Sequence, residues 1–104
     1  MNQNFKTSYH EDKEMPKVYR VLVERVKSVP LDCFFRWSRN EVPHLLVELG
    51  NGITYSICYF GRSKSWRVFW PYQTNNQQKR NFPSINNIIG FLEGDNLSAN
   101  GKEY

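Results

Sequence analysis

The stretch "LLVELGNGITYSICYF", residues 45–60, decides the fold that this sequence predicts. The Gly-Asn-Gly at its centre is a turn sequence that allows positive φ angles and closes β-hairpins. On both sides of this turn every second residue is apolar, which is typical of strands that bury one face. The stretch therefore predicts a hairpin of two antiparallel strands. One face of this hairpin would carry Leu45, Val47, Leu49, Ile53, Tyr55, Ile57 and Tyr59.

Two segments beside the hairpin have the same period of two. The alternation in "CFFRWSR", residues 33–39, predicts a strand before the hairpin. "WRVFW", residues 66–70, predicts a strand after it, with Arg67 and Phe69 on the face opposite the two tryptophans. Pro71 ends this strand, because proline cannot donate to a strand ladder. The short connections favour a meander of about four antiparallel strands.

The segment that follows these strands has a different composition. "QTNNQQKRN", residues 73–81, is polar and has no apolar period. Polar connections without a period are typical of surface loops. We therefore predict a mobile loop here, and we expect "QTNNQQKRNFP", residues 73–83, to act as a clamp that orders when a partner binds.

A helix is predicted before the strands, over "PKVYRVLVERVKSV", residues 16–29. The apolar residues at helical spacing, which cover one side of a helix, are Val18, Val21, Leu22, Val26 and Val29. Proline suits the first helical turn, and Pro30 ends the segment. A strand is the alternative, because valine is β-branched. Strict alternation fails at Arg25 and Val26, which favours the helix.

A second helix is predicted after the strands, over "FPSINNIIGFLEG", residues 82–94. Ser84 is a suitable N-cap, and Gly94 is a suitable residue just past the last turn. The side that packs on the sheet is predicted from the i, i+3, i+4, i+7 spacing of apolar residues. This apolar stripe consists of Ile85, Ile88, Ile89 and Leu92.

The order helix, strands, helix predicts an α+β fold with two layers. Both helices would cover the apolar face of the sheet, and the other face would contact water. A chain of 104 residues is expected to form one domain. We assign this domain to residues 16–94. Residues 1–15 are predicted to be a flexible polar arm, and residues 95–104 a frayed tail.

Charge is unevenly distributed along the chain. The net charge is +4, and no acidic residue occurs from Leu49 to Leu92. Segregation of this kind raises the local positive potential more than the net charge suggests. The cations of this block are Arg62, Lys64, Arg67, Lys79 and Arg80.

The two cysteines bear on the compartment. Cys33 and Cys58 each lie in an apolar run, where a free thiol behaves as a small hydrophobic group. This favours two reduced thiols, and a disulfide between neighbouring strands is the alternative. The N-terminal segment has no apolar core of a signal peptide, and no apolar run is long enough to cross a bilayer. We therefore expect a cytoplasmic protein in a reducing environment.

Catalytic and metal-binding patterns are weak in this sequence. His10 and His44 are the two histidines, and neither belongs to a spaced metal motif. A cysteine with His44 would be a possible nucleophile and base, but both cysteines are in apolar strands, where thiols are usually inert. We expect no enzyme activity, no metal and no cofactor.

Positive charge interleaved with aromatic rings instead predicts a binding module for a polyanion. Single-stranded nucleic acid is the first expectation, because rings stack on bases and cations track phosphates. The alternative is an interaction or inhibitor module that docks on an acidic protein through the same surface. Surface hairpins also carry Arg and Lys simply for solubility and edge protection. The predicted contact residues are Phe60, Arg62, Lys64, Arg67, Phe69, Lys79 and Arg80.

Overall fold

The computed structural model describes residues 7–9, 15–29, 31–39 and 43–100. The described strands form one six-stranded sheet in the order β1-β2-β3-β4-β5-β6. All neighbouring strands are antiparallel except β1 and β2, which are parallel. The elements are β1 (Thr7–Tyr9), α1 (Lys17–Lys27), β2 (Cys33–Ser38), β3 (His44–Leu49), β4 (Thr54–Phe60), β5 (Ser65–Trp70), β6 (Gln78–Phe82) and α2 (Ile85–Asn100).

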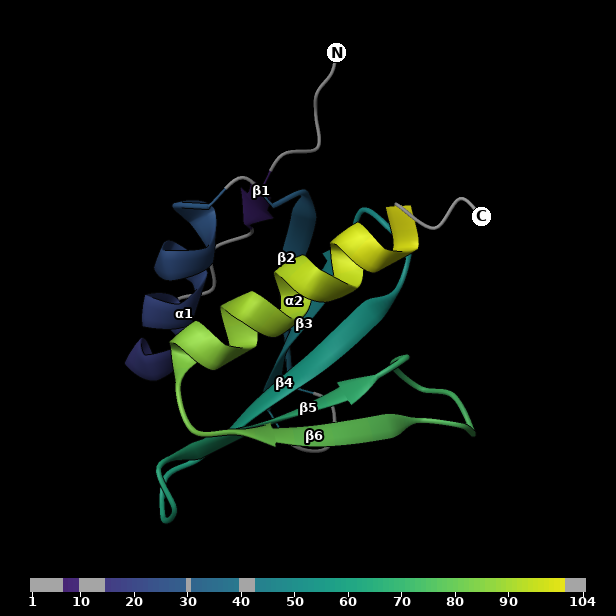
Figure 1. Ribbon diagram of the computed structural model, residues 1–104. Coiled ribbons are helices and arrows are strands. Elements are labelled where there is room, and N and C mark those ends of the chain that lie inside the picture. Colours follow the sequence, from purple (N-terminus) through teal and green to yellow (C-terminus); the bar gives the residue numbers. More distant parts are fainter. Residues whose placement is uncertain (1–6, 10–14, 30, 40–42, 101–104) are drawn as a thin grey trace.

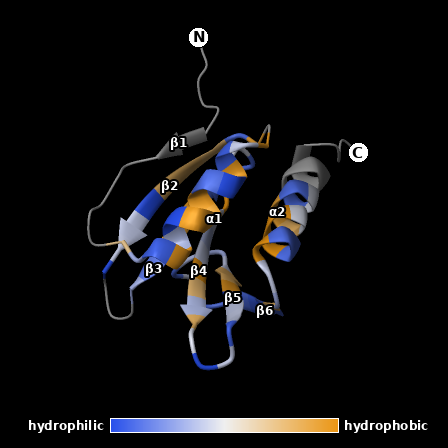
Figure 2. Ribbon diagram, turned by 90° about the vertical axis from the view of Figure 1, so that its left-hand side faces the viewer, coloured by the Kyte–Doolittle hydropathy of each residue, from blue (hydrophilic) through white to orange (hydrophobic). Residues whose placement is uncertain are grey.

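Both helices lie on the same face of this sheet (Figures 1 and 2). The α+β two-layer fold expected from the sequence is therefore confirmed, with more strands than the four predicted. The hairpin at residues 45–60 is confirmed as β3 and β4, with Leu45 opposite Ile57 and Val47 opposite Tyr55. Gly52 closes its turn with a φ of 86°, a conformation that glycine adopts without a steric penalty.

The core lies between the helices and this face of the sheet. From α1, Leu22, Val23 and Val26 are fully buried, and the helical interpretation of residues 16–29 is confirmed for Lys17–Lys27. The predicted apolar side is partly wrong, because Val21 is exposed and Val23 is buried. Tyr19 connects α1 to the sheet in two ways. Its ring is 4.8 Å from that of Trp37 and 5.5 Å from that of Trp66. Its hydroxyl also accepts a hydrogen bond of 2.7 Å from the N–H of Tyr59.

The second helix packs on the same face through Ile88, Ile89 and Leu92, as its spacing predicts. Ser84 caps its first turn, because the Asn87 N–H donates to the Ser84 Oγ at 3.4 Å. The Phe91 ring adds an aromatic contact, with its centroid 4.8 Å from the ring of Trp70.

The loop predicted over residues 73–81 is partly wrong. Gln78–Phe82 form β6, which pairs antiparallel with β5. Phe82 lies opposite Trp66 and is buried, whereas the other four residues are exposed. A strand at the edge of a sheet can be polar along most of its length, because one apolar residue is enough to attach it to the core. Apolar periodicity therefore could not identify β6.

Two predicted boundaries also differ from the structure. Thr7–Tyr9, within the segment assigned to a polar arm, form β1. The second helix continues through Gly94 to Asn100, so the tail was predicted to begin too early. Gly94 is a helical residue and not a C-terminal cap. The other residues of 1–14, and residues 101–104, lie outside the described residues.

A partly buried hydrogen bond joins α2 to the middle of the sheet. The hydroxyl of Tyr55 in β4 donates to the Asp95 Oδ2 at 2.6 Å, and the Asn51 Nδ2 donates to the same hydroxyl at 3.5 Å. The side chain of Tyr55 is fully buried. Burial raises the pKa of Tyr55 above its ordinary value, and the hydrogen bond to Asp95 raises it further.

Replacing this hydroxyl is expected to destabilise the fold. Tyr55→Phe removes the donor to Asp95, and we expect a loss of about 1–2 kcal/mol in the free energy of unfolding. Asp95→Asn retains an acceptor oxygen and is expected to lose less. Urea unfolding followed by circular dichroism measures both losses. Equal stability of Tyr55→Phe and the parent protein would mean that the hydrogen bond to Asp95 does not stabilise the fold.

Alkaline pH is expected to destabilise the protein through the hydroxyl groups of Tyr55 and Tyr19. Burial also raises the pKa of Tyr19. Both tyrosines therefore stay protonated in the folded state when their unfolded counterparts ionise near pH 10.0. Their contribution to stability is complete below this pH and is lost as the pH rises toward the folded-state values. Urea unfolding between pH 8 and pH 11 should show this loss, and Tyr55→Phe should make it smaller.

Candidate functional site

The face of the sheet opposite the helices is the open face. Trp66 and Val68 of β5 are buried in the core, so Arg67 and Phe69 point to the other side. The strand register continues this face across the sheet. The open face carries Phe34 and Arg36 of β2, Leu46 and Glu48 of β3, Ser56, Cys58 and Phe60 of β4, Arg67 and Phe69 of β5, and Lys79 and Asn81 of β6.

Arg67 contacts both an aromatic ring and an amide on this face. Its Cζ atom is 5.0 Å from the centroid of the Phe60 ring, which is 39 % exposed. Its Nε donates to the Asn81 Oδ1 at 2.8 Å. A guanidinium at this distance is attracted to the ring. Three neighbouring strands therefore hold one cation and one exposed ring in a fixed arrangement.

Phe69 and Lys79 extend this arrangement toward β6. They lie opposite each other in the register of β5 and β6. Phe69 is half-buried and Lys79 is exposed. We name Phe60, Arg67, Phe69, Lys79 and Asn81 the β4–β6 patch.

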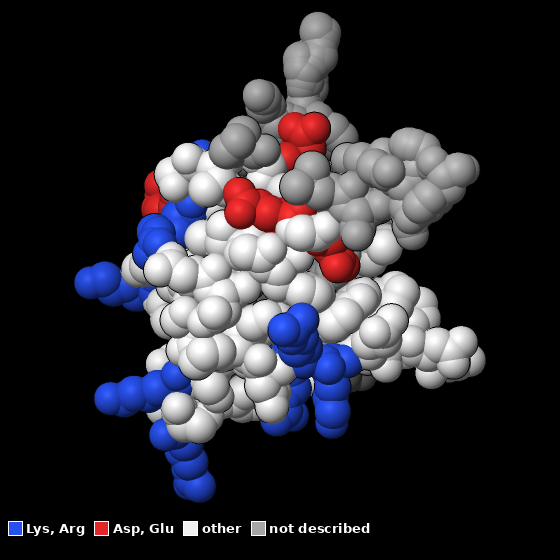
Figure 3. Space-filling model, in the orientation of Figure 1, with Lys and Arg blue, Asp and Glu red and all other residues white. Residues whose placement is uncertain are grey.

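The hairpin formed by β4 and β5 projects beyond the helices (Figures 1 and 2). Its turn carries Arg62 and Lys64, which are both exposed. Lys64 has a φ of 52°, in the left-handed region. Figure 3 shows Lys and Arg side chains over the lower part of the molecule, where this hairpin and β6 lie. The Asp and Glu side chains in this view lie over the upper part, where further Lys and Arg side chains lie beside them on the left.

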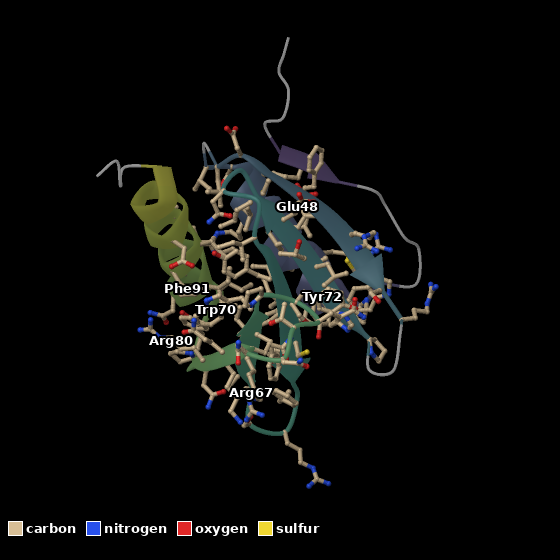
Figure 4. All side chains as sticks on the ribbon, turned by 90° about the vertical axis from the view of Figure 1, so that its right-hand side faces the viewer. Glu48, Arg67, Trp70, Tyr72, Arg80 and Phe91 are labelled. Atoms are coloured by element: carbon tan, nitrogen blue, oxygen red, sulfur yellow. The ribbon has the colours of Figure 1, made fainter. Side chains whose placement is uncertain are left out.

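The structure separates Arg80 from the other predicted contact residues. Arg80 lies opposite Val68 in the register, so it shares the face on which the helices pack. Its guanidinium lies over the rings of Phe82 and Phe91, at 5.3 and 5.7 Å from their centroids. Figure 4 shows Arg80 beside Phe91 and Trp70, on the side of α2. Lys79 and Arg80 point to opposite faces because successive residues of a strand do so.

The centre of the open face is covered, which the sequence analysis did not predict. His44, Leu46 and Ser56 point to this side and are buried. Tyr72 contributes to this cover, since its N–H donates to the Thr54 carbonyl at 2.9 Å and its ring is 5.5 Å from that of His44. Leu46 was a signal in the sequence, because it breaks the alternation of β3 with an apolar residue on the outer side.

The cysteines point to opposite faces of the sheet. Cys33 is in the core, whereas Cys58 lies on the open face opposite Arg67. Neither forms a disulfide, so the alternative of a disulfide between them is wrong. Burial raises the pKa of the Cys58 thiol, although a hydrogen bond with Ser56 and the charge of Arg67 lower it in part. Nucleophilic cysteines have a lowered pKa, which is the opposite of the direction at Cys58.

Known kinds of site and known proteins offer no guide to the activity. Within the described part of the chain, no group of three His, Cys, Asp or Glu residues could hold a metal ion. None of the described helices combines the length and the hydrophobicity that a membrane crossing requires. Comparisons of the chain with protein-family models, curated proteins and solved structures find no match. The function is therefore inferred from the residues of the open face.

The reactivity of the thiols tests how the two faces are assigned. In Cys33→Ser, the half-buried Cys58 should react with Ellman's reagent in the folded protein, at a rate that still rises above pH 9.0 because its pKa is raised. In Cys58→Ser, Cys33 should react only after unfolding in urea, because it is fully buried. Rapid reaction of Cys33 in the folded protein would contradict this arrangement of the sheet.

Proposed function

We propose that this protein is a non-enzymatic module that binds single-stranded nucleic acid through the β4–β6 patch. The observation that carries the proposal is the Arg67 guanidinium, held between the exposed Phe60 ring and the Asn81 amide. Exposed rings on strands stack on bases, while neighbouring cations contact phosphates. The absence of a disulfide between Cys33 and Cys58 suits a protein that works in the reducing environment of the cytoplasm.

The spacing of the rings supports a strand of several nucleotides. Phe60 lies opposite Ser65, which precedes Phe69 by four residues on β5. At about 3.3 Å per residue, the two rings are about 13 Å apart along the sheet. Arg67 lies between them. The patch thus offers two stacking positions with a cation in the middle.

Single strands suit this surface better than duplexes. The bases of a duplex are stacked on one another, whereas a single strand can splay its bases onto protein rings. Arg62 and Lys64 at the hairpin turn extend the cationic path beyond the sheet. The segment from Leu49 to Leu92 contains the whole patch and has no Asp or Glu. It therefore presents no carboxylate that would repel a phosphate.

Fluorescence anisotropy with labelled oligonucleotides tests this proposal. A single-stranded thymidine oligomer should bind at low salt, and more tightly than a duplex of the same length. The logarithm of the binding constant should fall linearly with the logarithm of the salt concentration, by about 0.7 for each phosphate that is neutralised.

Two matched pairs of variants locate the surface. Phe60 and Phe34 are both 39 % exposed on the open face, but Phe34 lies on β2, outside the patch. Phe60→Ser should lose about 1–3 kcal/mol of binding free energy, and Phe34→Ser should lose little. Lys79→Gln should lower the salt slope by about 0.7, whereas Arg80→Gln, with the same change in charge on the other face, should leave it unchanged.

Two outcomes would contradict the proposal. The first is no binding at low salt by a folded protein. The second is an equal loss of binding in both members of each pair, which would mean that the β4–β6 patch contributes no more than other surfaces do. Binding of an acidic protein that Phe60→Ser abolishes, without any binding of nucleic acid, would favour the interaction-module alternative.

A further inference from the structure

The outer edge of β6 is a second candidate binding surface. β6 is the last strand of the sheet, and among the described strands it pairs only with β5. The outer side of an edge strand presents N–H and C=O groups that can pair with another strand. Gln78, Lys79, Arg80 and Asn81 are all exposed along this edge. The edge is therefore accessible over most of its length.

Cations flank this edge on both faces of the sheet. Lys79 lies on the open face and Arg80 on the face of the helices. The Arg80 guanidinium is held over the Phe82 and Phe91 rings, so its charge has a defined position beside the strand. No acidic residue occurs on β5 or β6. A strand added at this edge would meet a positive charge on each of its two faces.

We propose that β6 accepts an extended acidic segment of a partner protein as an additional strand. Main-chain hydrogen bonds would supply the attachment, as in other cases of strand addition. Successive side chains of the added strand point to opposite faces. Two consecutive Asp or Glu residues would therefore lie beside Lys79 on one face and Arg80 on the other.

Two other occupants of this edge are disfavoured, a second copy of the chain by its charge and nucleic acid by its backbone. In a second copy of the chain, β6 would pair with its own equivalent and bring Lys79 and Arg80 beside like charges, which is destabilising. Nucleic acid has no peptide groups with which to complete a strand ladder. An acidic peptide supplies both the ladder and the opposite charge.

This inference goes beyond nucleic-acid binding on the open face. It depends on the main chain of β6 and on Arg80, which points away from that face. Lys79 is the one cation that both proposals use. A protein that fails to bind nucleic acid can therefore still be tested for peptide binding, and the reverse also holds.

A charge-swap experiment tests the inference. The probe is a fluorescein-labelled peptide, Val-Thr-Val-Glu-Glu-Val-Thr-Val, and its control has Lys-Lys in place of Glu-Glu. The full-length protein should bind the Glu-Glu peptide about tenfold more tightly than the Lys-Lys peptide, since each cross-strand pair changes from attractive to repulsive. The double variant Lys79→Glu/Arg80→Glu should reverse this preference. The matched variant Arg62→Glu/Lys64→Glu, with the same change in charge at the hairpin turn, should not reverse it.

Amide hydrogen exchange measured by NMR tests the mode of binding. The bound peptide should protect alternate amides of β6, because only every second N–H faces the free edge. A peptide N-methylated at its four central residues should neither bind nor protect. Equal binding of the Glu-Glu and Lys-Lys peptides by the parent protein would overturn the proposal. Binding of the Glu-Glu peptide without new protection in β6 would overturn it too. Failure of the double variant to exchange its preference would also overturn it.

Discussion

The fold depends on aromatic side chains of both helices that pack on one face of the sheet. Tyr19 of α1 contacts Trp37 and Trp66, and Phe91 of α2 contacts Tyr55, Trp70 and Phe82. Rings of this size bury much apolar area and dominate the energy of a small core. Because strand residues alternate, this packing commits every second side chain of β2 to β5 to the core. The remaining side chains, Arg67 and Phe60 among them, are left on the open face.

The open face is not uniformly exposed, and this limits the candidate site. The Tyr72 ring lies near His44, and the centre of the face around Leu46 is buried. Near the β4–β5 hairpin and β6, Phe60 lies against Arg67, and Asn81 holds the Arg67 side chain. At β2 the open face carries a second exposed ring and cation, Phe34 and Arg36. Binding surfaces of this kind need preorganised groups, because ordering a long side chain opposes binding. The contact of Arg67 with Phe60 supplies part of this order before any partner arrives.

Lys79 and Arg80 place positive charge on opposite faces of one strand. They are neighbours in the sequence, yet one belongs to the open face and the other packs on rings beside α2. Their common feature is the edge of the sheet. A polar edge strand with cations on both faces resists pairing with its own copy and favours an acidic strand.

The sequence by itself determined the two helices, the central hairpin, the strands on either side of it and the segregation of charge. Each of these follows from local periodicity or composition, which a single segment carries in full. Tertiary structure decided the rest. β6 is a strand because Phe82 reaches the core opposite Trp66, and its polar residues give no sign of this. The faces taken by Arg80 and Tyr72, and the extent of α2 past Gly94, depend on contacts between residues far apart in the chain. Such contacts leave no pattern in the segment where each residue lies.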